Sequence, residues 1–166
     1  MNRRVEFRRP AGRSRGFTLI EMIMVVMIVG ILASAAMPLA ALHQRRTQEA
    51  DLRLALRTLR TAIDAYKTAW DQGRMEKKEG DTGYPPNLDV LVSGVVDIGQ
   101  AGHRRLYFLR RLPRDPLAAA GLPAAETWAL RSYDSPPEAP QPGADVFDVR
   151  SRHEGRGLDG TLYQQW

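Results

Sequence analysis

The strongest pattern in the chain is a long apolar segment near its N-terminus. Residues 17–42 contain a single charged side chain, that of Glu21, and the 21 residues that follow it carry no charge. A helix rises about 1.5 Å per residue, so this stretch is long enough to cross a hydrocarbon core roughly 30 Å thick. The segment is therefore predicted to be a transmembrane helix.

A second pattern continues the helix beyond the apolar segment. Between residues 43 and 71, large apolar side chains recur at alternating steps of four and three, which places them on one face of a helix. Charged residues fill the other faces. Such a stripe is far more typical of a helix that faces a core than of a cofactor site. The apolar positions are Leu52, Leu56, Leu59, Ile63, Tyr66 and Trp70.

The rest of the chain, residues 72–166, is predicted to form one small globular domain. Its patterns are short, and its two strand-like runs come late and are separated by a proline-rich connection. A long helix followed by a few late strands indicates the α+β class. The predicted elements are a charged break at 72–83, a short helix over 88–92, a loop through 94–102, and strands over 128–133 and 145–149.

The positive charge of the chain is confined to its first residues. The net charge is +5, and residues 1–16 hold six arginines against one glutamate, which accounts for all of it. The other residues carry 18 basic and 18 acidic side chains. If residues 1–16 are a leader that is removed, the remaining chain is neutral. The basic pI of the full sequence is then no argument for binding nucleic acid.

The chain contains no cysteine. Structural disulfides, thiol catalysis and thiolate metal sites are therefore excluded. The globular domain must be stabilised by packing alone, or by packing together with a hard metal ion.

Two ordinary interpretations of the apolar segment compete with a more specific one. A secretory signal peptide would be cut near Ala33-Ser34-Ala35, but the apolar run exceeds the usual core of about 7–15 residues and continues past that point. A plain single-pass anchor would place Glu21 at the membrane interface by chance.

The more specific interpretation comes from the run Gly16-Phe17-Thr18-Leu19-Ile20-Glu21, preceded by arginines and followed by the apolar helix. This run resembles the N-terminal motif of the type IV pilin-like superfamily. The resemblance implies that a prepilin peptidase cuts between Gly16 and Phe17 and methylates the new N-terminus, so that Glu21 becomes the fifth residue of the mature chain. It also implies an N-terminus in the cytoplasm, an orientation that the arginine counts on either side of the helix favour only mildly.

The residue types at this motif suit the chemistry. Glycine leaves the backbone open to a protease, because it has no side chain. Cutting creates a charged amine beside an apolar helix, and the carboxylate of Glu21 is predicted to neutralise the amine of Phe17 in an adjacent subunit during assembly. Pro38 removes one helical hydrogen bond and so permits a kink or local melting.

Features of the globular domain narrow the resemblance to one branch. Ala62–Lys67, Gly83-Tyr84-Pro85, Leu112–Pro116 and a final loop that ends in Trp166 are similar to the major pseudopilin of type II secretion. The resemblance implies a long helix packed on a small C-terminal antiparallel sheet with irregular loops, anchored in the bacterial inner membrane with the globular domain in the periplasm. It also implies self-assembly into a helical filament, with other pseudopilins and the inner-membrane secretion platform as partners.

The same resemblance raises a question about calcium. The C-terminal loop of this family binds a calcium ion, which requires several oxygen ligands. In this chain only Asp159 has a position comparable to a family ligand, with Glu154 as a weaker candidate, and the stretch that contains Glu154 departs from the family pattern. Both residues are equally explained as parts of solvated turns. No cofactor is certain, and calcium is a candidate ligand.

The sequence contains no catalytic constellation. His43, His103 and His153 each lie beside an arginine and lack metal-ligand spacing, and no nucleophile elbow or phosphate-binding loop is present. The chain is not predicted to be an enzyme. The arginine pairs at 104–105 and 110–111 are either a partner surface or, more simply, solvated edges.

Three functions are compatible with these patterns. The first is a structural subunit of a type II secretion pseudopilus. The second is a major or minor pilin of a type IV pilus. The third is a single-pass anchored periplasmic binding module that does not polymerise.

Overall fold

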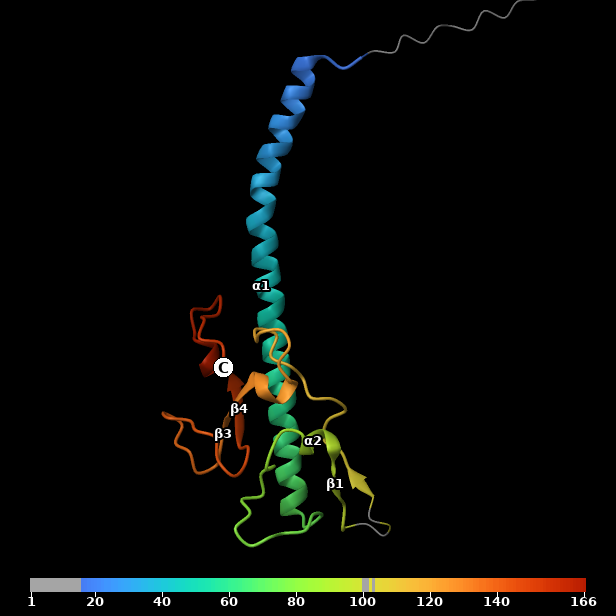
Figure 1. The fold of residues 1–166 in the computed structure, drawn as a ribbon, viewed down its shortest axis with the longest axis vertical. Helices are drawn as coiled ribbons and strands as arrows, with labels where there is room; N and C mark the ends of the chain where they lie inside the picture. The colour runs from blue at the N-terminus through green and yellow to red at the C-terminus, as the bar shows by residue number, and fades with distance from the viewer. Residues whose placement is uncertain (1–15, 100–101, 103) are drawn as a thin grey trace, which may run out of the picture. The chain divides into compact units, whose positions relative to one another are not determined.

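The computed structural model describes residues 16–99, 102 and 104–166 (Figure 1). The chain divides into two compact units, the first ending at Leu42 and the second running from His43 to Trp166. The helices and strands are, in order, α1 (Leu19–Asp71), α2 (Val90–Ser93), β1 (Val95–Val96), β2 (Arg105–Leu106), η1 (Ala124–Thr127), β3 (Trp128–Arg131), β4 (Asp148–Ser151) and η2 (Tyr163–Gln165). The predicted α+β class, with a long N-terminal helix and small antiparallel sheets, is confirmed.

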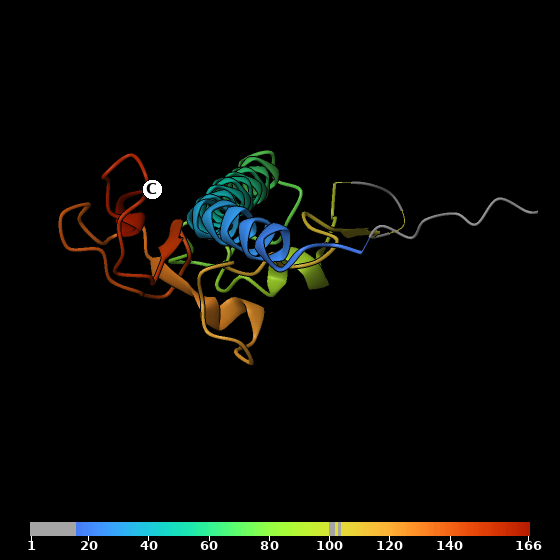
Figure 2. The same ribbon diagram turned by 90° about the horizontal axis from the view of Figure 1, so that it is seen from above.

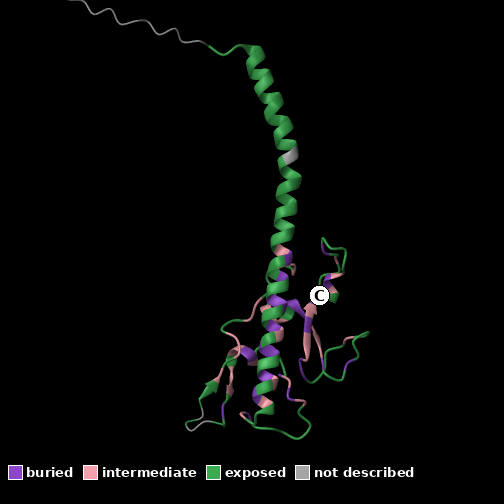
Figure 3. Cartoon of the chain, turned by 180° about the vertical axis from the view of Figure 1, so that it is seen from behind, coloured by how far each residue is buried: buried purple, intermediate pink, exposed green. Residues whose placement is uncertain are grey.

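The first part of helix α1 is uncovered. Every side chain described between Phe17 and Leu42 is exposed. Figure 3 draws one residue of this stretch in grey and the others in green. The exposed side chains are almost all apolar, so water is a poor solvent for them. This surface requires a covering that a single copy of the chain does not supply.

The second part of α1 carries the core of the globular unit. The predicted stripe is confirmed, because Leu52, Leu56, Leu59, Ile63 and Tyr66 are all buried and Trp70 packs against them. Alanines between these positions allow neighbouring segments to approach the helix closely. Burying each large side chain is worth about 1.5–3 kcal/mol, which fixes this face of the helix against the rest of the unit.

Two small antiparallel sheets accompany this part of the helix. Strand β1 pairs with β2, and β3 pairs with β4 in a register that sets Trp128 opposite Ser151. Figures 1 and 2 show the two pairs on different sides of α1. The alternating inward residues of β3 and β4 complete the core, with Trp128 and Val149 almost fully buried.

The strand boundaries differ from those predicted. The first predicted strand ends early, because the amide of Ser132 donates to Gln141 O and that of Tyr133 to Asp145 Oδ1. The second strand was predicted over 145–149 and lies at Asp148–Ser151. Before it, the Asp145 carboxylate also accepts a hydrogen bond from Thr82 and Val146 donates to Pro85 O, so these residues bind the 82–85 segment instead of β3.

The predicted loop through 94–102 begins with a strand. Val95 pairs with Leu106 in the β1–β2 hairpin, and Asp97 N–H donates to Arg104 O at 2.8 Å. The strands are only two residues long, so the sequence offers no run from which to recognise them. The short helix predicted over 88–92 is found at Val90–Ser93, with Asn87 Oδ1 accepting the Val90 N–H at 3.1 Å.

A buried polar cluster joins the 113–117 turn to both strands of the β3–β4 sheet. Asp115 is 1% exposed, and its carboxylate accepts hydrogen bonds from Ser151 Oγ at 2.6 Å and from the Leu117 amide at 2.8 Å. The indole of Trp128 donates to Pro113 O at 3.0 Å. Every one of these groups would lose hydrogen bonds to water on burial, and the cluster replaces those bonds.

Candidate functional site

The predicted processing point lies just before helix α1. Gly16 and Phe17 are both exposed, and a side chain added at Gly16 would meet no other atom within 4 Å. The described structure therefore gives Gly16 no internal packing role. An exposed glycine without packing contacts leaves the backbone accessible to a protease.

The helix start is fixed by Thr18, a residue that was not singled out from the sequence. Its side-chain oxygen accepts the amide hydrogen of Glu21 at 3.3 Å, and its carbonyl accepts the Met22 N–H at 3.2 Å. Thr18 and Glu21, three residues apart, have the spacing of a capping box. This spacing could have been recognised from the sequence. Glu21 thus occupies the first turn of α1, where a carboxylate also interacts favourably with the positive end of the helix.

The apolar part of α1 is the candidate membrane and assembly segment. Within the described residues, α1 is the one helix long and apolar enough to cross a membrane by length and composition. Pro38 lies inside it, and the helix continues through this proline to Asp71. Proline cannot donate a hydrogen bond, so the helix lacks one backbone bond at this position.

The C-terminal segment that contains Asp159 is bound to one side of α1 by polar contacts. Glu49 is 5% exposed, and its Oε1 accepts hydrogen bonds from the Leu158 amide and the Tyr163 hydroxyl, both at 2.9 Å. Glu49 precedes Leu52 by three positions, so it lies on the buried stripe. That spacing was the signal from which this carboxylate could have been recognised, although it was not among the predicted site residues.

Two arginines that were predicted to face solvent also bind this part of the chain. Arg60 Nε donates to Asp148 Oδ1 at 2.8 Å, and its Nη2 donates to Trp166 O at 2.7 Å. Arg53 Nη2 pairs with Asp159 Oδ2 at 2.7 Å, and its guanidinium lies 4.1 Å from the ring centre of Trp166. The helix therefore contacts the end of the chain through charged as well as apolar side chains.

The carboxylate of Asp159 accepts hydrogen bonds from protein donors, and its side chain is 43% exposed. Its Oδ1 accepts hydrogen bonds from Thr161 Oγ1 at 2.6 Å and from the Thr161 amide at 3.0 Å. These two bonds from Thr161, followed by the nearby charge of Arg53, lower the pKa of Asp159 below its ordinary value. The group is held in its charged form by protein donors.

The candidate calcium ligands do not form a calcium site. Glu154, the second candidate, is exposed. Among the described residues, no group of three or more histidine, cysteine or acidic side chains is placed to hold a metal ion. Calcium prefers six to eight oxygen ligands with several carboxylates among them. This loop offers two carboxylates, those of Glu154 and Asp159, and arginine and threonine already bind the second. The residues present do not fit the ion.

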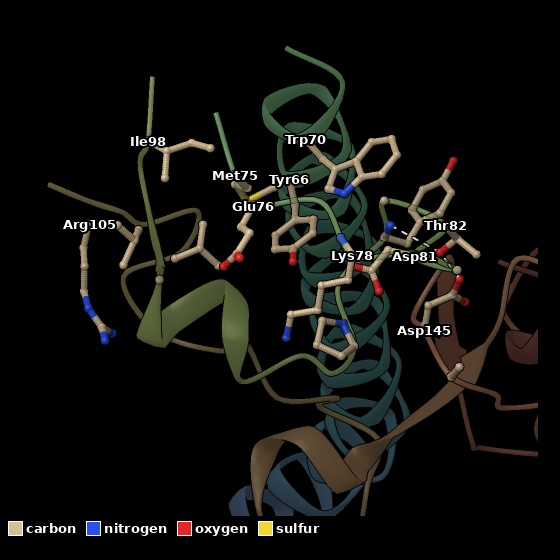
Figure 4. A pocket seen from close by; sticks show the side chains of 18 residues that line it. Tyr66, Trp70, Met75, Glu76, Lys78, Asp81, Thr82, Ile98, Arg105 and Asp145 are labelled. Atoms are coloured by element: carbon tan, nitrogen blue, oxygen red, sulfur yellow. Dashed lines mark hydrogen bonds between the residues drawn. The ribbon is translucent and has the colours of Figure 1, made fainter. Parts of the chain in front are cut away.

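One pocket of the globular unit is lined by aromatic, charged and small residues. It has a volume of about 660 Å³ and lies between the end of α1, the 75–84 segment and the β1–β2 hairpin. Figure 4 shows Tyr66 and Trp70 along one wall, with Glu76 and Lys78 reaching across it. The described residues that line it include no histidine, serine or cysteine.

The histidines and the surface arginines add no further site. His43 and His153 are exposed, and His103 lies outside the described residues. Arg105 Nη1 donates to Ser93 O at 2.8 Å, which gives one member of the arginine pairs a structural role. Arg110 and Arg111 are exposed.

Comparison with known proteins finds one family profile and several proteins of type II secretion that match this chain. The profile of the family described as Prokaryotic N-terminal methylation motif matches residues 12–37. The chain is 33% identical over 108 residues to the type II secretion system core protein G of Klebsiella pneumoniae, an alignment that covers 63% of this chain and 69% of that protein. With the protein of the same name from Aeromonas hydrophila, identity is 30% over 105 residues, covering 63% and 68% of the two chains.

A shorter match relates the chain to a pilus protein. The type IV major pilin protein PilA of Myxococcus xanthus is 40% identical over 60 residues, which cover 36% of this chain and 27% of that protein. No solved structure gives a significant match.

The relatives are named as pseudopilus and pilus proteins, and none of the three is named as an enzyme. The methylation motif and the apolar helix fit a single-pass inner-membrane protein. On the extent of its similarity to the core protein G of two organisms, the chain belongs to the type II secretion system core protein G family, the major pseudopilins of the type IV pilin-like superfamily.

Proposed function

We propose that this chain is a structural subunit of a type II secretion pseudopilus, assembled through its N-terminal helix. In this proposal residues 1–16 are a leader removed by a prepilin peptidase, and 17–42 form the transmembrane and assembly helix. Residues 43–71 extend that helix in the periplasm, and 72–166 complete the globular domain. The N-terminus lies in the cytoplasm before cleavage.

One observation carries the proposal: the uncovered apolar surface of α1. All described side chains from Phe17 to Leu42 are exposed in a single copy. Lipid covers this surface while the subunit is in the membrane. When the subunit leaves the membrane, equivalent helices of its neighbours must replace the lipid, because the helix has no polar face for water. Identical contacts that do not close into a ring then build an open helical filament.

Glu21 sets the register of the assembly in this proposal. Cleavage after Gly16 leaves a charged amine on Phe17, next to an apolar helix. An unpaired charge at the centre of a membrane helix costs about 2.5–3.5 kcal/mol on insertion scales, and a charge near the helix end, such as this amine, costs less. The carboxylate of Glu21 in one subunit neutralises the amine of Phe17 in the next, and only one stagger of the two helices allows this. Pro38 gives the assembly helix a position at which it can bend.

Mass spectrometry of the membrane-bound protein tests the first step. We expect a mature N-terminus at Phe17 carrying one added methyl group, and Gly16→Ala is expected to leave most of the chain uncut, because the added methyl obstructs the protease. An intact Met1, or a start at Ala36, would support a plain anchor or a secreted module instead.

Filament formation tests the second step. Glu21→Ala is expected to be cleaved and inserted normally, since the helix becomes more apolar, but to give few filaments by electron microscopy and little cross-linking between copies. Glu138→Ala, which removes an exposed carboxylate from a loop of the globular unit, is the matched control and is expected to assemble normally. Normal filament yield from Glu21→Ala would contradict the register role.

A pilin of a type IV pilus is a second candidate, favoured by the match to the Myxococcus xanthus pilin. Deleting the gene separates the two. A pseudopilus subunit is expected to affect export of folded proteins across the outer membrane, whereas a pilin is expected to affect surface pili. If the deletion affects neither protein export nor surface pili, and the protein is monomeric in the membrane, the non-polymerising module is favoured.

A further inference from the structure

The backbone and side-chain oxygens of the loop at 156–161 are bound by guanidinium groups. Arg45 Nη2 donates to Arg156 O at 2.5 Å, Arg53 Nη2 pairs with Asp159 Oδ2 at 2.7 Å, and Arg156 Nη1 donates to Gly160 O at 3.0 Å. Two of these arginines come from helix α1 and one from the loop itself. Guanidinium donors thus bind three oxygens of this turn.

The loop is closed further by a chain of contacts around Asp159. Gly157 N–H donates to Thr161 O at 2.8 Å, and Thr161 donates to Asp159 through both its amide and its hydroxyl. The indole N–H of Trp166 donates to Thr161 Oγ1 at 2.5 Å, and Arg53 lies over the Trp166 ring. Because Arg53 stacks on Trp166 and also pairs with Asp159, it fixes the positions of both side chains.

The opposite edge of the loop is held by a carboxylate of the helix. Glu49 receives the Leu158 amide and the Tyr163 hydroxyl, and Arg45 Nε lies 3.7 Å from the same Glu49 oxygen. The positions of Arg45, Glu49 and Arg53 differ by four, so a single face of α1 presents all three side chains to the loop.

We propose that these helix side chains, with Arg45 and Arg53 as the cations, close the C-terminal loop in place of a bound calcium ion, so that the folded protein neither needs nor binds calcium. A hard cation would have to displace guanidinium donors from its ligands. The positive charges of Arg45, Arg53 and Arg156, which the carboxylates of Glu49 and Asp159 offset only in part, also oppose its entry. The proposal does not depend on the assembly role proposed above, since it concerns the globular unit alone.

Calcium dependence of stability tests the proposal directly. The full chain in detergent micelles is heated in about 5 mM calcium chloride and in excess chelator while tryptophan fluorescence is recorded. We expect the two midpoints to agree within about 1 °C, because a ligand that does not bind the native state shifts nothing. A midpoint raised by several degrees in calcium would overturn the proposal.

Terbium gives an independent readout of the same loop. Terbium replaces calcium in oxygen sites and emits when a nearby aromatic ring is excited, and Tyr163 and Trp166 both adjoin this loop. We expect the wild-type emission to be no greater than that of Asp159→Asn. Strong emission that calcium competes away, and that Asp159→Asn abolishes, would contradict the proposal even if stability did not change.

Substitution of the proposed cation completes the test. Arg53→Met keeps much of the apolar stem but removes the ion pair and the stacked charge, and it is expected to lower the midpoint by roughly 2–5 °C in chelator. Arg46→Met is the matched control, since Arg46 is an exposed arginine on the same helix, and its midpoint is expected to stay within about 1 °C of wild type. Equal midpoints for the two variants would show that Arg53 does not hold the loop.

Discussion

Replacing Asp115 by alanine should destabilise the globular unit more than its small size suggests. Its carboxylate is 1% exposed and accepts two hydrogen bonds, from Ser151 Oγ and from the Leu117 amide. Alanine leaves both donors without this acceptor; Ser151 is 0% exposed, and Leu117 is partly buried. A donor buried without a partner costs about 1–3 kcal/mol, so the free energy of unfolding should fall by roughly 2–4 kcal/mol.

Trp128 makes the measurement convenient. Its ring is fully buried beside this cluster, and its indole N–H is bound to Pro113 O, so it contributes to the tryptophan fluorescence together with Trp70 and Trp166. For a unit of this size, the predicted loss corresponds to a midpoint lower by roughly 8–15 °C in thermal unfolding of the detergent-solubilised chain. Asp134→Ala removes an exposed aspartate and serves as the control, with a shift of about 1 °C or less.

A double-mutant cycle isolates the energy of the hydrogen bond between Asp115 and Ser151 from the other contacts of the cluster. Ser151→Ala removes the donor, so the double variant Asp115→Ala with Ser151→Ala should be more stable than the sum of the single losses predicts, by about 1 kcal/mol or more. If Asp115→Ala alone lowered stability by less than about 1 kcal/mol, the carboxylate would not be a structural acceptor, and the reasoning from burial and hydrogen bonds would be refuted.

Two further predictions concern the turn beneath α1 and the response to acid. Gly83 has φ of +85°, and a Cβ there would lie 2.7 Å from the Trp70 ring, so Gly83→Ala should lower the unfolding midpoint, whereas alanine at Gly80, also at positive φ but with nothing within 4 Å, should lower it less. The hydrogen bond from Arg74 lowers the pKa of Asp97, so this carboxylate stabilises the fold above its ordinary pKa of 3.8 and loses that effect as pH falls through its lowered folded pKa. Denaturant titrations from about pH 5 to about pH 2 should therefore show a shallower loss of stability for Asp97→Asn than for wild type, and identical slopes would contradict the assignment.

The features that were predictable from sequence are those fixed by local pattern. The apolar run after Glu21 and the stripe from Leu52 to Tyr66 each repeat within one helix, so their period is visible without knowledge of the partner surface. The two late strands were also recognisable as apolar runs. Their bounds were not, because the residues that end them bind segments far away in sequence, as Asp145 binds Thr82.

Polar residues that act through distant contacts could not be assigned in the same way. Arg53 and Arg60 have the spacing of an exposed helix face, and only the fold brings Asp159 and Asp148 to them. The calcium candidates illustrate the same limit. Asp159 was selected by its position near the end of the chain, whereas the arginine that pairs with it lies 106 residues earlier. A carboxylate in a sequence does not reveal whether its counter-ion is a metal or a guanidinium.

The contacts of Glu49 bear on the order in which the chain folds. This buried carboxylate finds its donors at Leu158 and Tyr163, which lie 109 and 114 residues further along. Until those residues arrive, the helix would present a charged group in the middle of its apolar stripe. Contacts of such long sequence separation slow folding, because much of the chain must be brought together before they form. We therefore expect the globular unit to fold only after nearly all of it has been synthesised, late enough for a chaperone to bind the unfinished stripe.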